Sequence, residues 1–331
     1  MRAYIVRLAL GALLLALSVP AAAQQPGKVY RIGIFAGSTQ DPREQRGNEA
    51  LQQGLHELGY MEGKNVILEY CYTEGNVALL PELAADLVRS KVDIIFAAAA
   101  GYVGVLAAKQ ATTTIPIVFV GLATDPVETG LVESLARPGG NITGLTNLTI
   151  EIAGKRLELF KAAVPTLTRI AVLYDAANPG NVLHAQAVQT AGHALGVTVQ
   201  LQEIRGLDDF ERVFAALREE RPDGLYVPGG PLTRGNEQRI VDFAVKSGIP
   251  SVHDSREAVE AGGLMSYAYD IVDRYRRLAY YVDKILKGSR PADLPVERPM
   301  KFELVLNLKT AQHIGLTVPP EVLYQADKVI K

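Results

Sequence analysis

Cysteine is almost absent from this chain of 331 residues, in which Cys71 stands alone. A single cysteine cannot form an intramolecular disulfide. Cys71 lies in a stretch, residues 66–72, that reads as a strand, and no histidine is near it in sequence. We therefore interpret Cys71 as an inert packing residue, buried or partly exposed, and not as a catalytic thiol.

Neither sign of charge is in excess, because 34 basic residues stand against 36 acidic ones. Proteins that bind nucleic acid or anionic membrane surfaces usually carry a basic surplus. The composition therefore predicts no nucleic-acid partner. Apolar residues make up 48% of the chain, which is enough for one large core or two ordinary ones, and the length favours two domains.

Motifs of the common enzyme classes are missing as well. The sequence has no Gly-x-Ser-x-Gly elbow, no His-Glu-x-x-His pair, no paired-cysteine metal spacing and no phosphate-binding glycine loop with a lysine. The first predicted strand is followed by AGSTQD, which is not a dinucleotide-binding fingerprint. We accordingly expect no enzyme activity, no catalytic residue, no metal site and no cofactor.

The longest apolar run, residues 8–17, is well short of the ~20 residues that span a bilayer. Arg2 and Arg7 precede it, and three alanines at 21–23 follow it. This pattern is typical of a cleavable secretory signal peptide over residues 1–23. No cysteine lies near the cleavage site to carry a lipid anchor, so we expect a soluble protein exported to a bacterial periplasm.

The stretch RIAVLYDAANPG at residues 169–180 shows the pattern around which the chain is organised. Residues 170–174 read as a buried strand, the turn-forming residues after them end it, and helical spacing begins at residue 182. Open α/β sheets bind ligands at such strand-to-helix loops. Similar strands and helices alternate in the first half, which predicts parallel sheets covered on both faces by helices. Strands are expected there at 29–35, 66–72, 92–97 and 115–120. Helices are expected at 43–58, 79–89 and 103–110.

Four segments of the first half recur in the second half, in the same order and at nearly constant offset. The matches are RIGIF at 31–35 with RIAVL at 169–173, LGY at 58–60 with LGV at 195–197, VDIIF at 92–96 with PDGLY at 222–226, and IPIVF at 115–119 with IPSVH at 249–253. The repeat predicts two copies of one βα architecture. Two such lobes would form a cleft, and residues 174–178 would face residues 38–41 when the lobes close.

Three segments do not fit the duplication, and we interpret them as hinge crossovers: residues 140–148, 261–267 and 288–295. The predicted fold is therefore α/β, with two Rossmann-like lobes that have parallel sheets and are joined by three hinge crossovers. A helix at about 271–287 would return to the first lobe, and a strand at 302–306 would belong to the second. The expected N-terminal lobe is 28–147 plus 265–290, and the expected C-terminal lobe is 148–264 plus 291–331.

Several longer motifs carry a resemblance to a known family. They are LGYMEGKN at 58–65, LPELA at 80–84, AAKQA at 107–111, TIPIV at 114–118, DPV at 125–127, LARPGGNITG at 135–144, GKRLEL at 154–159, NP at 178–179, EAGGLMSY at 260–267, DKILKG at 283–288 and FELVLNLKTA at 302–311. Through these motifs nearly the whole mature chain resembles the substrate-binding proteins of ATP-binding-cassette importers, in the subgroup described as tryptophan or aromatic amino acid binders.

The resemblance implies a type I periplasmic binding fold with one small-molecule ligand, an amino acid or aromatic carboxylate, clamped between two lobes. It also implies a membrane permease as partner, and we expect the chain to act as a monomer. One loop departs from the family pattern, because AAAAGY at residues 97–102 replaces a Gly/Thr-rich loop with a proline. That loop should supply backbone amides at a helix amino end.

Strand-end loops and hinge segments supply the candidate ligand-binding residues: Ser38, Thr39, Ala100, Gly101, Tyr102, Asp125, Asn147, Tyr174, Asp175, Asn178, Gly229, Gly230, Asp254 and Tyr267. Structural roles for them remain open. Serine, threonine, aspartate and asparagine at these positions also form helix caps and turns, and tyrosines also pack in cores. His253 aligns with Phe119 in the repeat, which favours a core or rim position.

Three functions stay open at this level. The first is a receptor that delivers a solute to an importer, and the second is a sensory binding protein that presents its closed form to a signalling receptor. The third is an enzyme built on the same fold, which turnover of a bound compound would reveal.

Overall fold

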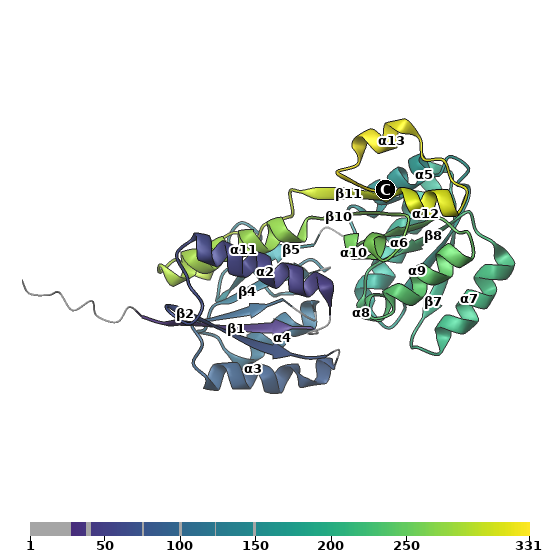
Figure 1. Ribbon diagram of the computed structural model, residues 1–331. Coiled ribbons are helices and arrows are strands. Elements are labelled where there is room, and N and C mark those ends of the chain that lie inside the picture. The colour runs from purple at the N-terminus through teal and green to yellow at the C-terminus, as the bar shows by residue number, and fades with distance from the viewer. Residues whose placement is uncertain (1–27, 38–40, 75, 99–100, 123, 148–149) are drawn as a thin grey trace, which may run out of the picture.

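The computed structural model describes residues 28–331 except 38–40, 75, 99–100, 123 and 148–149 (Figure 1). The predicted signal peptide, residues 1–23, lies outside the described residues. The chain forms two α/β lobes, each built on its own sheet, and crosses between them three times. This confirms the predicted two-lobed α/β fold.

The sheet of the first lobe has five parallel strands in the order β2-β1-β3-β4-β5. Its strands are β1 (Tyr30–Ala36), β2 (Val66–Tyr72), β3 (Ile94–Ala97), β4 (Ile117–Leu122) and β5 (Ile142–Thr146). The strands β1, β3, β4 and β5 are almost entirely buried. Near-continuous apolar runs are typical of parallel strands that helices cover on both faces.

Two helix pairs cover this sheet. The helices α2 (Pro42–Glu57) and α11 (Ile271–Leu286) pack on one face, while α3 (Leu80–Arg89) and α4 (Gly101–Ala111) pack on the other, with a 3-10 turn at Val77–Leu79 before α3. The helices α2 and α11 lie close to each other: a Cβ atom on Gly47 would stand 2.7 Å from the ring of Tyr275. A helix from late in the sequence thus completes the first core.

The sheet of the second lobe has seven strands in the order β12-β11-β10-β9-β8-β6-β7. They are β6 (Arg169–Asp175), β7 (Thr198–Ile204), β8 (Gly224–Val227), β9 (Ser251–His253), β10 (Met265–Tyr269), β11 (Phe302–Asn307) and β12 (Lys328–Ile330). One core includes residues of α5 (Ala153–Ala163), α6 (Pro179–Leu195), α12 (Leu308–His313) and α13 (Pro320–Gln325). The other includes residues of α7 (Asp209–Glu220) and α9 (Glu237–Lys246), and the short helices α8 (Pro231–Arg234) and α10 (Arg256–Glu260) follow β8 and β9.

The duplication predicted from the sequence is confirmed by the sheet order. The strands β2-β1-β3-β4-β5 of the first lobe correspond to β7-β6-β8-β9-β10 of the second. All four sequence matches fall on equivalent elements, namely β1 with β6, β3 with β8, β4 with β9, and the carboxyl ends of α2 and α6. Both lobes therefore have equivalent carboxyl ends of their strands.

The crossovers lie later in the chain than the sequence suggested. Residues 142–146 form β5 inside the first sheet, and residues 265–269 form β10 inside the second, so neither segment is itself a crossover. Val296 packs in the core of the first lobe, and Thr143 donates a hydrogen bond to the carbonyl of Leu294. The chain thus crosses after Thr146, after Tyr269 and before Phe302. These glycine-punctuated segments are apolar, and as strands β5 and β10 they are mostly buried.

Strand β11 departs from the expected all-parallel arrangement, since it runs antiparallel to β10. The chain leaves the second sheet at the carboxyl end of β10, folds α11 onto the first lobe, and returns from that same side (Figure 1). It must then enter the sheet from the end at which it left, so the next strand runs in the opposite direction.

We expect Gly144→Ala to destabilise the first lobe. Gly144 pairs with Phe119 across β4 and β5, and a Cβ atom there would stand 2.1 Å from the carbonyl oxygen of Phe119. A clash with backbone cannot relax through a side-chain rotation, so we expect a loss of about 3 kcal/mol in unfolding free energy. Urea unfolding measures it.

Gly206→Ala is the matched control, because no atom of the described residues lies within 4 Å of the position that its methyl group would take. It should change the unfolding free energy by less than about 0.5 kcal/mol. Equal stability of the two variants would contradict the close approach of β4 and β5.

Candidate functional site

A polar cluster forms where the strands of the second lobe end. Asn178 caps α6 by accepting the N–H of Asn181 at 3.2 Å. The Asn181 side chain then links two strand ends: its Oδ1 accepts the N–H of Asp175 at 3.3 Å, and its Nδ2 donates to the carbonyl of Gly229 at 2.9 Å. Asp175 at the end of β6 and Gly229 after β8 are thus held together, as expected for neighbouring parallel strands.

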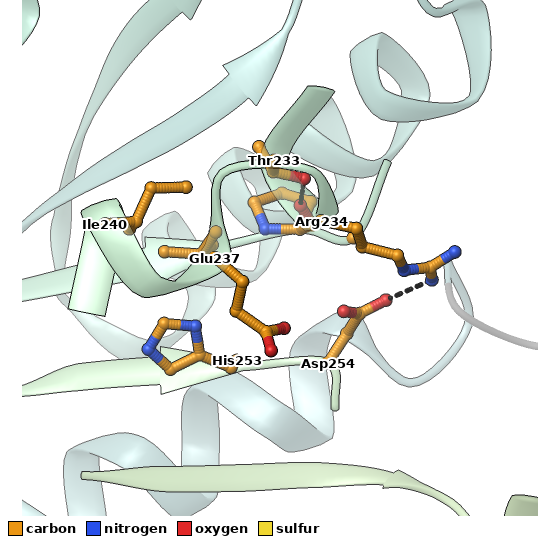
Figure 2. A pocket seen from close by; sticks show the side chains of 9 residues that line it. Thr233, Arg234, Glu237, Ile240, His253 and Asp254 are labelled. Carbon is orange, nitrogen blue, oxygen red and sulfur yellow. Dashed lines mark hydrogen bonds and ion pairs between the residues drawn. The ribbon is translucent and has the colours of Figure 1, made fainter. Parts of the chain in front are cut away.

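Asp254 follows β9 and joins the same cluster. It is 5% exposed, and its Oδ2 accepts a hydrogen bond from Arg234 of α8 at 3.0 Å. A Cβ atom on Gly229 would stand 2.0 Å from this oxygen, so only glycine leaves room for the carboxylate. Figure 2 shows Arg234 reaching toward Asp254 across a small hollow that Gly229 and Glu237 also line.

The Asp254 carboxylate is ionised at neutral pH. Burial by itself would raise its pKa, but the guanidinium groups of Arg234, Arg43 and Arg156 overcome this effect and hold the pKa well below its usual range. Arg43 belongs to the first lobe and Arg234 to the second. Asp254 is therefore a negative charge that is stabilised by arginines of both lobes.

Glu237 at the start of α9 is a contrasting acid in the same hollow. Burial raises its pKa to about 7, the Asp254 and Glu257 charges add to the rise, and a hydrogen bond from Ser255 at 2.8 Å partly opposes it. His253, 2% exposed, is kept neutral because burial lowers its pKa to about 4. This agrees with the core or rim position expected for His253 and leaves Glu237 as the group that titrates near neutral pH.

The first lobe contributes the start of α2, which contacts the second lobe. Arg43 donates from Nη2 to the hydroxyl of Tyr269, and its guanidinium lies 5.1 Å from the ring centroid. Arg274 of α11 lies on the same ring at 3.9 Å. Tyr269 at the end of β10 is thus held between two cations. Burial would raise the pKa of Tyr269, but Arg43, Arg274 and Arg234 more than offset this and lower it.

A second contact between the lobes lies one turn further along α2. Arg46 donates to Glu257 at 2.8 Å and to Glu260 at 2.9 Å, both of which lie on α10. A hollow between the lobes is lined by Arg43 and Arg46 from one side and by Asp254 and Tyr269 from the other. These residues outline a candidate ligand-binding hollow between the lobes.

The predicted site residues of the first lobe are only partly described. Ser38, Thr39 and Ala100 lie outside the described residues. Gly101 and Tyr102 begin α4, where Tyr102 packs partly against the core. Asp125 is exposed and accepts the N–H groups of Val127 and Glu128, so its carboxylate closes a turn.

The remaining predicted residues divide into two groups. Gly230 caps α8, where its N–H donates to Thr233 at 2.8 Å, and it belongs to the strand-end cluster with Asp175, Gly229 and Asp254. Asn147 lies at the first crossover and accepts a hydrogen bond from Arg274. Tyr174 and Tyr267, by contrast, pack against the core of the second lobe, and Tyr267 stacks on Phe302 with 5.6 Å between ring centroids.

Sequence reasoning missed the basic residues of the site. Arg43, Arg234 and Arg274 all lie on helices, where no local motif distinguishes them from solvent-exposed arginines. The only signal in the sequence is that each of these arginines lies in the first turn of a helix, or at its end, close to a strand-end loop. Asn181 was missed for the same reason, although the N-cap Asn178 stands just before it.

Other classes of site find no support in the part of the chain that the structure describes. No group of three or more histidine, cysteine, aspartate or glutamate side chains is arranged to hold a metal ion there. Within the same residues, no helix combines the length and apolar character needed to cross a membrane. Burial, followed by the Glu69 charge, raises the pKa of the Cys71 thiol and so disfavours the reactive thiolate.

Comparison with known proteins defines the class. The family described as ABC transporter substrate binding protein matches residues 39–330. The chain therefore belongs to the ABC transporter substrate-binding protein family, and its fold is that of the type I periplasmic binding proteins.

Individual relatives are moderately similar. A tyrosine-binding protein of Clostridioides difficile is 26% identical over 294 residues, which cover 87% of this chain and 82% of that protein. A conserved domain protein of Vibrio cholerae has a TM-score of 0.83 at 27% identity, covering 91% of this chain and 100% of that one. An ABC domain from Streptococcus pneumonia in complex with L-Trp has a TM-score of 0.82 at 26% identity, covering 92% and 100%.

We expect Glu237→Gln to remove a pH dependence of stability. The folded protein raises the pKa of Glu237 from 4.5 to about 7, so it binds this proton more tightly than the unfolded chain does. The stabilising contribution is complete below pH 4.5 and is lost as the pH rises through 7. The variant should match wild type at the acidic end and exceed it by about 3 kcal/mol above neutrality.

Urea unfolding of both proteins across this pH range is the measurement. Glu219→Gln, at an exposed position of α7, is the control and should follow wild type throughout. A Glu237→Gln curve parallel to wild type would show that folding does not raise the pKa of Glu237.

Proposed function

We propose that this protein is a periplasmic receptor that closes on an aromatic amino acid or aromatic carboxylate and delivers it to the permease of an ABC importer. The observation that carries the proposal is the pair of equivalent strand edges on two lobes, with polar side chains from both lobes lining one hollow. Membership of the substrate-binding family supports the same conclusion. Both half-sites belong to one chain, so we propose that it acts as a monomer.

Affinity in this proposal comes from closure. In an open form each lobe exposes its own polar strand ends, and a ligand that contacts both lobes stabilises the closed form by its differential affinity. The segments that bend are the three crossovers, which lie beside Thr146, Tyr269 and Phe302.

The aromatic amino acid class rests on the relatives. The Clostridioides difficile relative is named for tyrosine, and one structural relative was solved with L-Trp, each at 26% identity. For the contacts we propose the residues predicted from the sequence, in which Asp125 and Asp175 offer carboxylates from opposite lobes. The other proposed contacts are Ser38, Thr39, Ala100, Gly101, Tyr102, Asn147, Tyr174, Asn178, Gly229, Gly230, Asp254 and Tyr267.

We propose no catalytic role for this cleft. A sensory receptor would use the same closed form, and the two functions differ only in the membrane protein that recognises it. Pull-down from detergent-solubilised membranes of the native host separates importer from sensor, because the captured membrane protein is either a transport permease or a signalling receptor.

The amino-acid class can be tested directly, because the chain contains no tryptophan. The fluorescence of added L-tryptophan then reports only the ligand, and burial in the cleft should shift its emission to shorter wavelength. We expect a Kd on the order of micromolar or tighter for L-tryptophan, L-tyrosine or L-phenylalanine, with a higher melting temperature at saturation.

Asp125→Ala and Asp175→Ala test the two proposed carboxylates separately, and each should weaken binding about tenfold or more. Wild-type affinity in both variants would remove these carboxylates from the site. Failure of all three amino acids to bind would overturn the aromatic amino acid class while leaving the family assignment in place.

We propose that residues 1–23 are removed on export and that the mature protein begins at Gln24. Expression with an intact amino terminus in a Gram-negative host should place the protein in the periplasmic fraction, and amino-terminal sequencing should read QQPGK. A retained Met1 in the membrane fraction would contradict cleavage.

A further inference from the structure

Two arginines at the lobe interface are buried without complete hydrogen bonding to the residues that the structure describes. Arg43 is 8% exposed; its Nη2 donates to Tyr269, while its Nη1 has no hydrogen-bond partner among those residues. Arg274 is 3% exposed, and its Nε likewise has no partner there. Both guanidinium groups lie on the ring of Tyr269, so the two unsatisfied donors belong to one cluster.

The acids around this cluster are already engaged. Among the described residues, none forms an ion pair with Arg43 or Arg274. The nearby carboxylates have other partners: Asp254 pairs with Arg234, Glu257 with Arg46, and Asp270 with Lys301, while Asp41 accepts the backbone N–H of Arg43 and Glu44 accepts that of Gly37. Burial would lower the pKa of Arg43, but charges that include those of Asp254, Glu257 and Asp41 raise it. Among the described residues, however, none of these carboxylates accepts a hydrogen bond from Nη1 of Arg43 or Nε of Arg274.

A buried donor without a hydrogen-bond partner is costly, because the hydrogen bonds that water would make are not replaced. Arg43 and Tyr269 line the hollow between the lobes, and Asp254 lines both this hollow and the one in Figure 2. The unsatisfied cation thus lies where a ligand would contact both lobes.

We propose that the carboxylate of the ligand binds Arg43, with Arg274 and the Tyr269 hydroxyl beside it, so that the receptor selects organic acids and rejects the corresponding amines. This inference rests on the proposed function, and it names the group of the ligand that the cleft recognises. Guanidinium forms charge-assisted hydrogen bonds to carboxylate, and the phenol of Tyr269, which accepts from Arg43, has its own proton to donate.

Arg46 provides a matched comparison on the same helix. It also reaches the second lobe from α2, but its Nη1 and Nη2 are already bound to Glu257 and Glu260. Arg46→Gln removes one positive charge and a contact between the lobes without removing an unsatisfied donor. An effect that comes only from a change in lobe closure should therefore appear both in Arg46→Gln and in the corresponding variant Arg43→Gln.

The experiment measures the affinity of wild type, Arg43→Gln and Arg46→Gln for three probes by calorimetry: L-tryptophan, tryptamine, which lacks the carboxylate, and indole-3-propionate, which lacks the ammonium. Wild type should bind tryptamine at least tenfold more weakly than L-tryptophan. Arg43→Gln should lose at least tenfold in affinity for both acids and little for tryptamine, whereas Arg46→Gln should change all three affinities by a similar factor.

The outcomes separate this inference from the proposed function. Binding of L-tryptophan that is unaffected by Arg43→Gln, in a variant with a wild-type melting profile, overturns the inference and leaves the function standing. Binding of indole-3-propionate but not L-tryptophan, with dependence on Arg43, overturns the amino-acid class and supports the inference. If neither L-tryptophan nor indole-3-propionate binds, the inference is overturned as well.

Arg43→Lys is a second variant that tests the inference even if Arg43→Gln fails to fold. Lysine keeps the charge but not the planar pair of donors, so we expect an affinity for L-tryptophan between those of wild type and Arg43→Gln. Equal loss in both variants for acids and tryptamine alike would show a structural role for Arg43 and would also overturn the inference.

Discussion

The connection between the lobes depends on the guanidinium of Arg274. It donates to Asn147 and to the carbonyl of Thr146 at the end of β5, and it lies 3.9 Å from the ring centroid of Tyr269 at the end of β10. One side chain at the start of α11 therefore ties two crossovers together. Because any bending between the lobes must pass through these segments, Arg274 lies at the centre of the hinge.

Ion pairs extend this connection to the third crossover. Lys301 pairs with Asp270 at 2.6 Å, and Arg277 pairs with Glu297 at 2.6 Å. The backbone of Glu297 also bonds to Gly144 and Thr146 of β5. The three crossings are thus linked to one another by ion pairs and backbone hydrogen bonds.

The strand-end cluster of the second lobe could be predicted in part. Asp175, Asn178, Gly229 and Asp254 follow strands whose apolar runs are plain in the sequence, so parallel-sheet geometry alone brings them to one edge. The basic half of the site could not be predicted, because Arg43 and Arg274 meet at Tyr269 only through the return of α11 to the first lobe. The crossovers were placed too early because a glycine-punctuated strand and a linker have the same local composition.

The amino-acid sequence by itself determined the two-lobed architecture, since short apolar strands alternate with helices and the pattern repeats in the second half. It also marked the strand-end loops, because turn chemistry is local. Only the tertiary structure decided which charges meet: Arg234 faces Asp254, Arg46 faces Glu257, and Arg43 keeps a nitrogen without a partner among the described residues. Charge pairing depends on distances between residues far apart in the chain, and the burial that sets the pKa values of Glu237 and Asp254 exists only after the chain has folded.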